Sequence, residues 1–292
     1  MVEPARGSRS LRGWLQTQAR RPAESPTLTG RPADLYPALS AYPAEETSLA
    51  EPGDLTRFER RVLSQNGEDG VVAEVLRRVG VGPRWFVEFG VGPGHEGVCV
   101  ALADVLGWSG LFMESEPELH AELARKYCAN PRVRTERAFV DASNVDELFA
   151  AGGVPSEVDV VSIDVDGNDW WIWRALTHVR PRLVVIEYNG NLDPAAQLVK
   201  PYDPQTSWDQ TCWFGASLGA YERLGADKGY TLVHTDLRGV NAFFLRDDLC
   251  PAFGPVSSPR RVANYDLFGA RMPGDPAEVP WVDLTVDGDP SL

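Results

Sequence analysis

The stretch Phe86-Val-Glu-Phe-Gly-Val-Gly-Pro-Gly-His-Glu-Gly97 joins a short apolar run to a series of glycines. The apolar run ends at Phe89, and three glycines follow at alternate positions. Glycine is needed where a backbone turns tightly and approaches another group closely. We therefore predict a buried strand over residues 85–89, a glycine-rich turn, and a helix over residues 98–106.

Apolar strands and helical segments alternate through the middle of the chain. Further strands are predicted at residues 111–113, 133–140, 158–163 and 183–186, with helices at 71–79, 118–127, 145–150, 169–179 and 216–228. This alternation indicates a parallel sheet covered on both faces. Two final strands, 230–234 and 241–245, are joined by too few residues for a crossover and must be antiparallel. We predict an α/β, Rossmann-like fold: a seven-stranded, mostly parallel sheet with an antiparallel last strand and helices on both faces.

Proline marks both ends of the chain. We predict an N-terminal arm over residues 1–55, partly disordered, and a Pro-rich C-terminal tail over residues 251–292. The domain between them, residues 56–250, contains an irregular insertion near residues 189–214. Within this domain, Asn66 and Asn168 precede predicted helices and are predicted to be their N-caps.

The composition excludes several classes of protein. The net charge is −14, and so acidic a surface repels phosphate backbones, which excludes nucleic acid as an expected partner. No apolar run approaches the roughly 18 residues that a membrane span needs, and the first residues lack the apolar core of a secretory signal. The four cysteines are scattered, which fits reduced thiols. We expect a cytoplasmic protein with no membrane span.

Acidic residues recur where the predicted strands end. Glu88 lies in the first strand, and Glu114, Asp141 and Asp164 follow the next three. Ligands of open α/β sheets bind beyond the carboxyl ends of the strands, so these side chains should face one crevice.

Two classes of cofactor use a glycine turn of this kind. Gly92, Gly94 and Gly97 satisfy the dinucleotide pattern GxGxxG, which is weak evidence alone. Glu88, with glycines at 90, 92 and 94, satisfies the acidic-x-Gly-x-Gly-x-Gly pattern of S-adenosylmethionine enzymes. The first glycine should follow the strand directly, as Gly90 does, and Glu88 suits a cationic ligand better than a pyrophosphate. The register therefore favours S-adenosylmethionine, with NAD as the alternative.

The ordered set of motifs resembles the class I S-adenosylmethionine-dependent methyltransferases, and among them the FkbM-like group. The motifs are SQNGED at 64–69, FVEFG at 86–90, GWSGLFME at 107–114, SIDVDG at 162–167 and VVIEY at 184–188. The resemblance implies an enzyme that uses S-adenosylmethionine to methylate a hydroxyl of a small molecule, such as a sugar or a secondary metabolite. It implies cofactor binding by Glu88, Gly90, Gly92, Gly94, Glu114, Ser115, Asp141, Ala142 and Asp164. An NAD-dependent oxidoreductase and a non-catalytic S-adenosylmethionine-binding protein stay open as alternatives.

The acceptor side must orient a hydroxyl and take up its proton. Asp164 and His95 are the candidate catalytic residues, and His234 is a second candidate base. Mg²⁺ is a candidate second cofactor, with Asp164, Glu187 and Asn189 as its candidate ligands. The candidate acceptor contacts are Gln65, Trp170, Glu187, Asn189, Trp208 and Asp209, with core packing as the alternative for the tryptophans. The expected partner is a small-molecule acceptor, and a homo-oligomer stays open.

Overall fold

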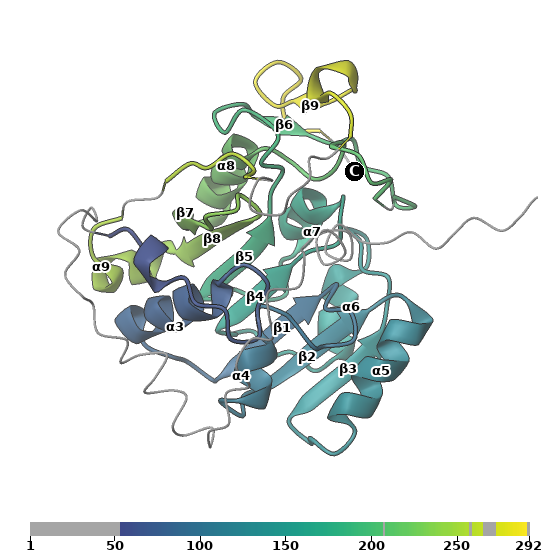
Figure 1. Ribbon diagram of the computed structural model, residues 1–292, viewed down its shortest axis with the longest axis vertical. Coiled ribbons are helices and arrows are strands. Elements are labelled where there is room, and N and C mark those ends of the chain that lie inside the picture. Colours follow the sequence, from purple (N-terminus) through teal and green to yellow (C-terminus); the bar gives the residue numbers. More distant parts are fainter. Residues whose placement is uncertain (1–52, 207, 257–258, 265–272, 291–292) are drawn as a thin grey trace, which may run out of the picture.

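Seven strands of the chain form one sheet in the computed structural model (Figure 1), which describes residues 53–206, 208–256, 259–264 and 273–290. The strand order is β3-β2-β1-β4-β5-β8-β7. The strands are β1 (Trp85–Phe89), β2 (Ser109–Glu114), β3 (Val133–Arg137), β4 (Val160–Ile163), β5 (Leu183–Glu187), β7 (Tyr230–Thr235) and β8 (Asn241–Arg246). Strands β1 to β5 run parallel, and β8 is antiparallel to both of its neighbours. The predicted fold class is confirmed, and the antiparallel last strand lies inside the sheet.

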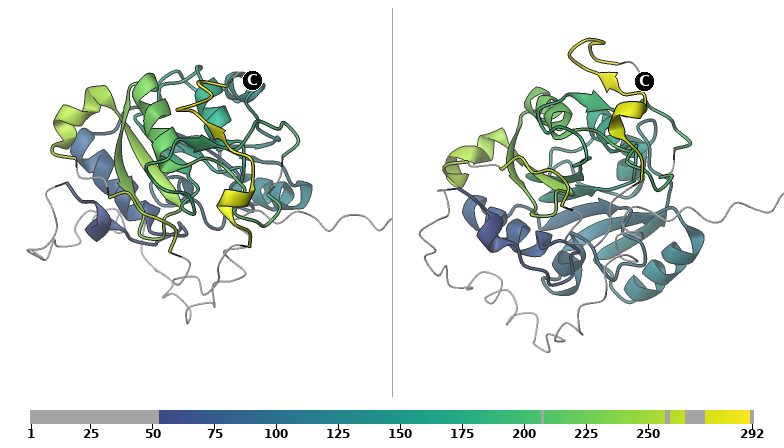
Figure 2. Two further views of the ribbon diagram at one scale, coloured as in Figure 1. Left: turned by 90° about the horizontal axis from the view of Figure 1, so that it is seen from above. Right: turned by 45° about the horizontal axis from the view of Figure 1, so that its top comes forward.

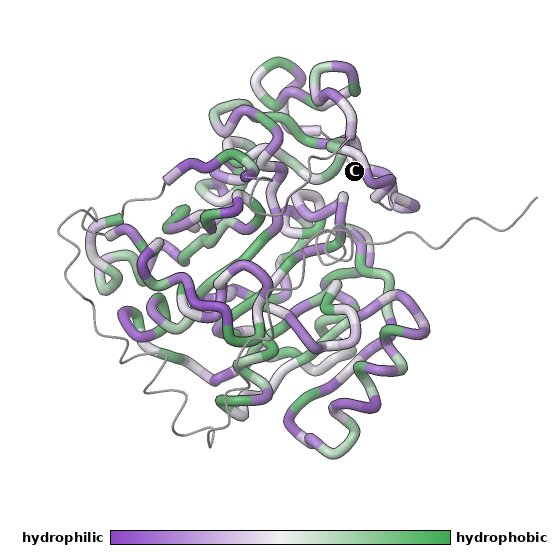
Figure 3. Tube along the Cα trace, viewed as in Figure 1, coloured by the Kyte–Doolittle hydropathy of each residue, from purple (hydrophilic) through white to green (hydrophobic). Residues whose placement is uncertain are grey.

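Helices cover both faces of the sheet because the side chains of each strand alternate between two apolar cores. Val87 and Phe89 belong to the core under α6 (Val145–Ala151), α7 (Asp169–Ala175) and α8 (Leu218–Lys228). Phe86 and Phe112 belong to the core under α3 (Glu68–Val79), α4 (Val100–Asp104), α5 (Pro117–Tyr127) and α9 (Cys250–Phe253). Figure 3 shows the hydrophobic residues along the central strands. None of the helices in the described part of the chain is long and apolar enough to cross a membrane.

The C-terminal segment 273–290 is fastened to the predicted insertion (Figure 2). Its strand β9 (Val282–Asp283) pairs with β6 (Leu198–Val199), and Trp213 Nε1 donates to the carbonyl of Pro280 at 3.2 Å. This described part of the Pro-rich tail therefore helps to hold the insertion in place. The N-terminal arm predicted over residues 1–55 lies almost wholly outside the described residues.

The N-cap prediction is wrong for Asn66 and right in position for Asn168. Helix α3 starts after Gly67, and Asn66 donates instead to Glu68 Oε1 at 3.1 Å. Asn168 is at the N-cap position of α7 but makes no capping side-chain bond. In its place Asp169 reaches back, and its two carboxylate oxygens accept from the backbone N–H groups of Val165 and Gly167 at 2.8 and 2.9 Å. The carboxylate of Asp169, the first residue of α7, thus stabilises the turn that follows β4.

Candidate functional site

The glycine turn after β1 is pressed against the turn after β4. Gly90 has φ +76°, and a Cβ atom built on it would lie 1.8 Å from the backbone oxygen of Asp164. Gly92 has φ +62°, and no described atom lies within 4 Å of a Cβ built there. Positive φ favours glycine at both positions. The turn therefore touches β4 at Gly90 and faces open space at Gly92.

Glu88 lies beneath this turn and is only 1% exposed. Its carboxylate oxygens accept from the backbone N–H groups of Val98 and Cys99, each at 2.9 Å. A buried carboxylate needs such partners, because burial without them is costly. Glu88 thus holds the residues that enter α4, and it occupies the amide groups that a pyrophosphate would need.

Glu114, at the end of β2, joins the glycine turn to the neighbouring strand. Its Oε2 accepts from the N–H of Gly92 at 2.8 Å, and its Oε1 accepts from the N–H of Glu116 at 2.9 Å. Ser115 follows, with its hydroxyl 3.5 Å from Glu114 Oε1. The predicted cofactor residues at the ends of β1 and β2 are therefore adjacent.

Asp141 and Ala142 lie in the turn after β3, next along the sheet. Asp141 is half-buried, and its Oδ1 accepts from the backbone N–H and the hydroxyl of Ser143 at 2.6 and 2.7 Å. Ala142 is buried beside it.

Three carboxylates converge at the ends of β4 and β5. One oxygen each of Asp164, Asp166 and Glu187 lies within 4.8 Å of the others, and we call these residues the acid cluster. Asp166 and Glu187 are buried, whereas Asp164 is half-buried. Asp166 also has φ +60°, a backbone conformation that residues other than glycine rarely adopt. Such conformations are often found at functional sites. Asp166 belongs to the motif SIDVDG but was not among the predicted metal ligands.

Asn189 is not part of the acid cluster. Its Nδ2 donates to the carbonyls of Cys212 and Phe214 at 2.8 and 2.9 Å, and its Oδ1 accepts from the backbone and side-chain N–H groups of Asn191. These bonds use both donors and both acceptor sites of the amide. Asn189 therefore fastens the insertion, and Asp166 is the residue that lies beside Asp164 and Glu187.

Two buried groups lie behind the acid cluster. Burial raises the pKa of Asp169 to about 6. Burial, together with the charges of Asp169, Glu187 and Asp164, raises the pKa of Tyr221 well above its ordinary value. The hydroxyl of Tyr221 has no hydrogen-bond partner among the described residues.

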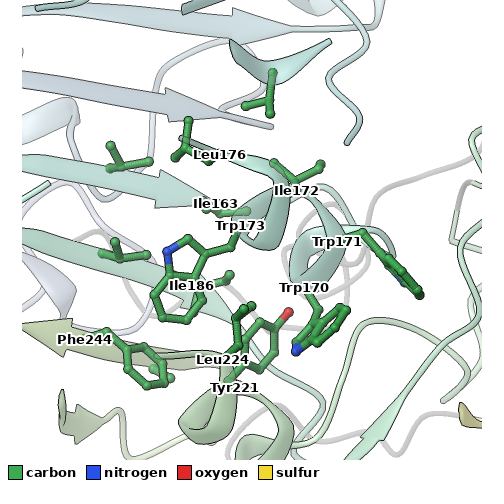
Figure 4. Packing of buried hydrophobic residues seen from close by; sticks show 14 of the residues in the cluster. Ile163, Trp170, Trp171, Ile172, Trp173, Leu176, Ile186, Tyr221, Leu224 and Phe244 are labelled. Atoms are coloured by element: carbon green, nitrogen blue, oxygen red, sulfur yellow. The ribbon is translucent and has the colours of Figure 1, made fainter. Parts of the chain in front are cut away.

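The tryptophans of α7 are core residues (Figure 4). Trp170 is 2% exposed, and its Nε1 donates to the carbonyl of Ala220 at 3.2 Å. Trp171 is buried against it at a centroid distance of 5.0 Å, and Trp173 packs on Phe244 at 4.9 Å. The core alternative therefore holds for Trp170, because α8 covers the face that was predicted to line the acceptor pocket.

Trp208 and Asp209 form a local turn in the insertion. Trp208 is buried and its Nε1 donates to the carbonyl of Thr211 at 2.7 Å. Asp209 is exposed, and its Oδ1 accepts from the backbone and hydroxyl of Thr211 at 2.9 and 2.6 Å. The hydrogen bonds of both side chains to Thr211 therefore stabilise their own loop.

The loop 61–66 lies on the glycine turn, because the N–H of Gly97 donates to the carbonyl of Leu63 at 2.8 Å. Gln65 in this loop has a buried Nε2 with no hydrogen-bond partner among the described residues, so it can donate to a ligand.

The two histidine candidates lie in different surroundings. His95 follows Gly94 in the glycine turn and is exposed. His234 is buried, and its Nε2 lies 2.9 Å from Glu59 Oε1. Burial, with the nearby charge of Arg261, lowers the pKa of His234 to about 3, so it is neutral at pH 7. Its role as a base is not favoured by this enclosed position.

No protein-family model matches this chain, and no curated protein matches it either. Among solved structures, the N-terminal domain of EvdMO1 with SAH bound is 16% identical over 63% of this chain and 80% of that chain, with a TM-score of 0.41. The mitomycin 7-O-methyltransferase MmcR is 14% identical over 60% of this chain and 53% of that chain, with a TM-score of 0.34. Fibrillarin from Aeropyrum pernix, in complex with natively bound S-adenosyl-L-methionine, is 16% identical over 66% of this chain and 84% of that chain, with a TM-score of 0.38. The chain is thus similar to structures that include methyltransferases, and the FkbM-like group stays a prediction.

Proposed function

We propose that this chain is an S-adenosylmethionine-dependent methyltransferase that methylates a hydroxyl group of a small molecule. The observation that carries the proposal is the contact of Gly90 with the backbone of Asp164. It puts the glycine turn and the acid cluster side by side at the carboxyl ends of β1 and β4, where α/β sheets bind ligands. A donor held at the turn and an acceptor held at the cluster would be neighbours, as in-line transfer requires.

The residues around the turn fit the cofactor. The open space above Gly92 leaves room for a ligand against the backbone, and Glu114 lies at the end of the neighbouring strand. We assign cofactor binding to these two residues with Gly90, Asp141 and Ala142, and assign to Glu88 the task of holding the turn. S-adenosylmethionine supplies the methyl group from its sulfonium when bound. Gln65 adds a donor from the loop above the turn.

Asp164 is our candidate for the group that takes the hydroxyl proton. It is half-buried, whereas the other two carboxylates of the cluster are buried. A carboxylate near an acceptor hydroxyl is a common general base.

The oxygen atoms of Asp164, Asp166 and Glu187 also fit Mg²⁺, which prefers carboxylate ligands and retained waters. Bound there, Mg²⁺ would lower the pKa of the acceptor hydroxyl. Transfer that EDTA abolishes and Mg²⁺ restores would assign the cluster to the cation, and transfer that EDTA leaves unchanged would assign proton uptake to Asp164 alone.

A nicotinamide-dependent oxidoreductase is the alternative that the residues favour less. Glu88 occupies the N–H groups of Val98 and Cys99, just before α4, where a pyrophosphate would bind. We expect calorimetry to detect binding of S-adenosylhomocysteine and none of NAD. Binding of NAD without S-adenosylhomocysteine would sink the proposal. A panel of hydroxyl acceptors would separate an enzyme from a non-catalytic binding protein.

Replacing Gly92 by Ala is expected to weaken S-adenosylhomocysteine binding by about tenfold or more, because the methyl group enters the space proposed for the ligand (about 1.4 kcal/mol per tenfold change). Stability should fall by only about 1–2 kcal/mol, the cost of a left-handed alanine. Calorimetry and thermal unfolding measure the two effects.

Gly229→Ala is the matched control for this variant. Gly229 is left-handed, and a Cβ built on it meets only Asp247 Oδ2 at 4.0 Å, but it follows α8 instead of lying in the turn. It should lose similar stability and keep full affinity. Equal affinity in both variants would show that the ligand does not lie over Gly92.

A further inference from the structure

Lys200 is a buried lysine in the insertion, directly after β6, and is 6% exposed. Its backbone is held from two sides, because its N–H donates to the carbonyl of Gly215 and its own carbonyl accepts from Trp171 Nε1, both at 2.9 Å. The backbone of Lys200 is therefore fixed to Trp171 of α7.

The ammonium group of Lys200 joins two points of the following loop. Nζ donates to Thr206 Oγ1 at 2.8 Å and lies 4.7 Å from the centroid of the Trp213 ring. Burial lowers the pKa of Lys200, and the nearby charges of Asp209, Asp203 and Asp169 oppose that effect. We call residues 203–206 and 208–213 the acceptor loop. The cation thus contacts this loop at two separate positions, Thr206 and Trp213.

The acceptor loop is docked on the turn that carries the acid cluster. A Cβ atom built on Gly167 would lie 2.9 Å from Thr206 Cγ2, so the threonine methyl rests on this glycine. Asn168 Nδ2 donates to the carbonyl of Asp203 at 2.8 Å. The position of the loop is therefore coupled to the segment between Asp166 and α7.

We infer that Lys200 is a positioning residue of the acceptor side, whose ammonium group clamps the acceptor loop onto the turn that carries Asp164 and Asp166. The inference rests on the proposed function, because only a methyltransferase would bind an acceptor beside this loop. The clamp itself rests on the contacts of Lys200 with Thr206 and Trp213 and on those of the acceptor loop with Gly167 and Asn168.

The free-energy cost of burying the ammonium group distinguishes a positioning role from a purely structural one. A buried ammonium is costly, and replacing buried charges by apolar groups of similar volume is often neutral or stabilising. A purely structural position would favour an apolar residue. A charge kept here despite its cost is expected where function gains from it.

The test replaces Lys200 by Met, which keeps the length of the side chain and removes its charge and donors. We expect faster amide hydrogen exchange in peptides of the acceptor loop, with no fall in the unfolding temperature. We expect the KM for the acceptor to rise by about tenfold or more, because loosened positioning is costly to transfer, with unchanged affinity for S-adenosylhomocysteine.

Lys228→Met is the matched control. Lys228 is also partly buried, but its Nζ donates to the carbonyls of Arg174 and Leu176 at 3.2 and 2.9 Å, at the C-terminal end of α7. This variant should leave exchange in the acceptor loop and the acceptor KM unchanged. Thr206→Val removes the hydroxyl and keeps a methyl group for Gly167. If Lys200 acts through Thr206, the double variant should match Lys200→Met instead of adding to it.

Three outcomes are distinguishable. Unchanged exchange in the acceptor loop of Lys200→Met would mean that Lys200 does not clamp the loop, whatever the unfolding temperature, and would overturn the inference. Faster exchange with an unchanged acceptor KM would also overturn the positioning role. Faster exchange in a protein whose wild type transfers no methyl group would support the clamp while the proposed function fails.

Discussion

Methyl transfer is expected to fall by about 10²–10⁴-fold in kcat when Asp164 is replaced by Asn, the range that a general base typically contributes. The asparagine keeps the volume of the side chain but cannot accept the proton of the hydroxyl. The contact with Gly90 involves the backbone oxygen of residue 164, which the substitution leaves in place. Binding of S-adenosylhomocysteine should therefore stay close to that of the wild type. Steady-state kinetics with the best acceptor, together with calorimetry, measure both quantities.

Asp193→Asn is the control for a change of one charge near the acceptor side. Asp193 is exposed in the insertion near residues 189–214, and its Oδ1 accepts from the N–H of Ala195 at 2.9 Å. This variant should transfer methyl groups at the wild-type rate. If Asp164→Asn does so as well, Asp164 takes no proton and the mechanism loses its base.

Replacing Gly90 by Ala is the second large effect, and it acts on the fold. The new Cβ atom would lie 1.8 Å from the Asp164 oxygen, so the turns after β1 and β4 must separate. Overpacking of this kind costs about 1–3 kcal/mol, and a left-handed alanine costs about 1–2 kcal/mol more. Together these are a large share of the roughly 5–15 kcal/mol that stabilises a typical domain. We expect the midpoint of urea unfolding to fall strongly.

The comparison with Gly229→Ala separates the contact from the cost of a positive φ. The two glycines have φ +76° and +79°, and the nearest described atom to a Cβ built on Gly229 is Asp247 Oδ2 at 4.0 Å. The difference between the two variants in the free energy of unfolding is therefore the cost of pushing β1 and β4 apart. Equal losses would mean that the two turns can separate freely, and the observation behind the proposed function would lose its weight.

The arrangement of strands could be predicted from the sequence because it depends on local patterns. Continuous apolar runs such as 183–186 mark buried parallel strands, and six residues between the last two strands allow only a hairpin. The register of the glycine turn was also readable, since Gly90 follows β1 directly. The neighbourhood of the glycine turn and the acid cluster follows from the same pattern.

The direction in which each polar side chain points could not be predicted, because it depends on partners far away in the chain. Asn189 bonds to the carbonyls of Cys212 and Phe214, and no local signal announces them. Trp170 is buried by α8, some fifty positions along the chain, which leaves core and pocket indistinguishable in the sequence. Lys200 gave no signal at all, since a single lysine after an apolar pair usually reaches solvent.

The place of β8 has a consequence for the order in which the chain can fold during synthesis. β8 is the last strand of the large sheet to leave the ribosome, yet it lies between β5 and β7. Until it arrives, β5 offers an open edge of five buried residues, Leu183–Glu187, and β7 has no neighbour with which to pair. At typical rates of translation this interval, roughly 60 residues, lasts roughly 3–12 s. Open apolar edges are templates for pairing with other chains, so chains that stop before Asn241 are expected to aggregate.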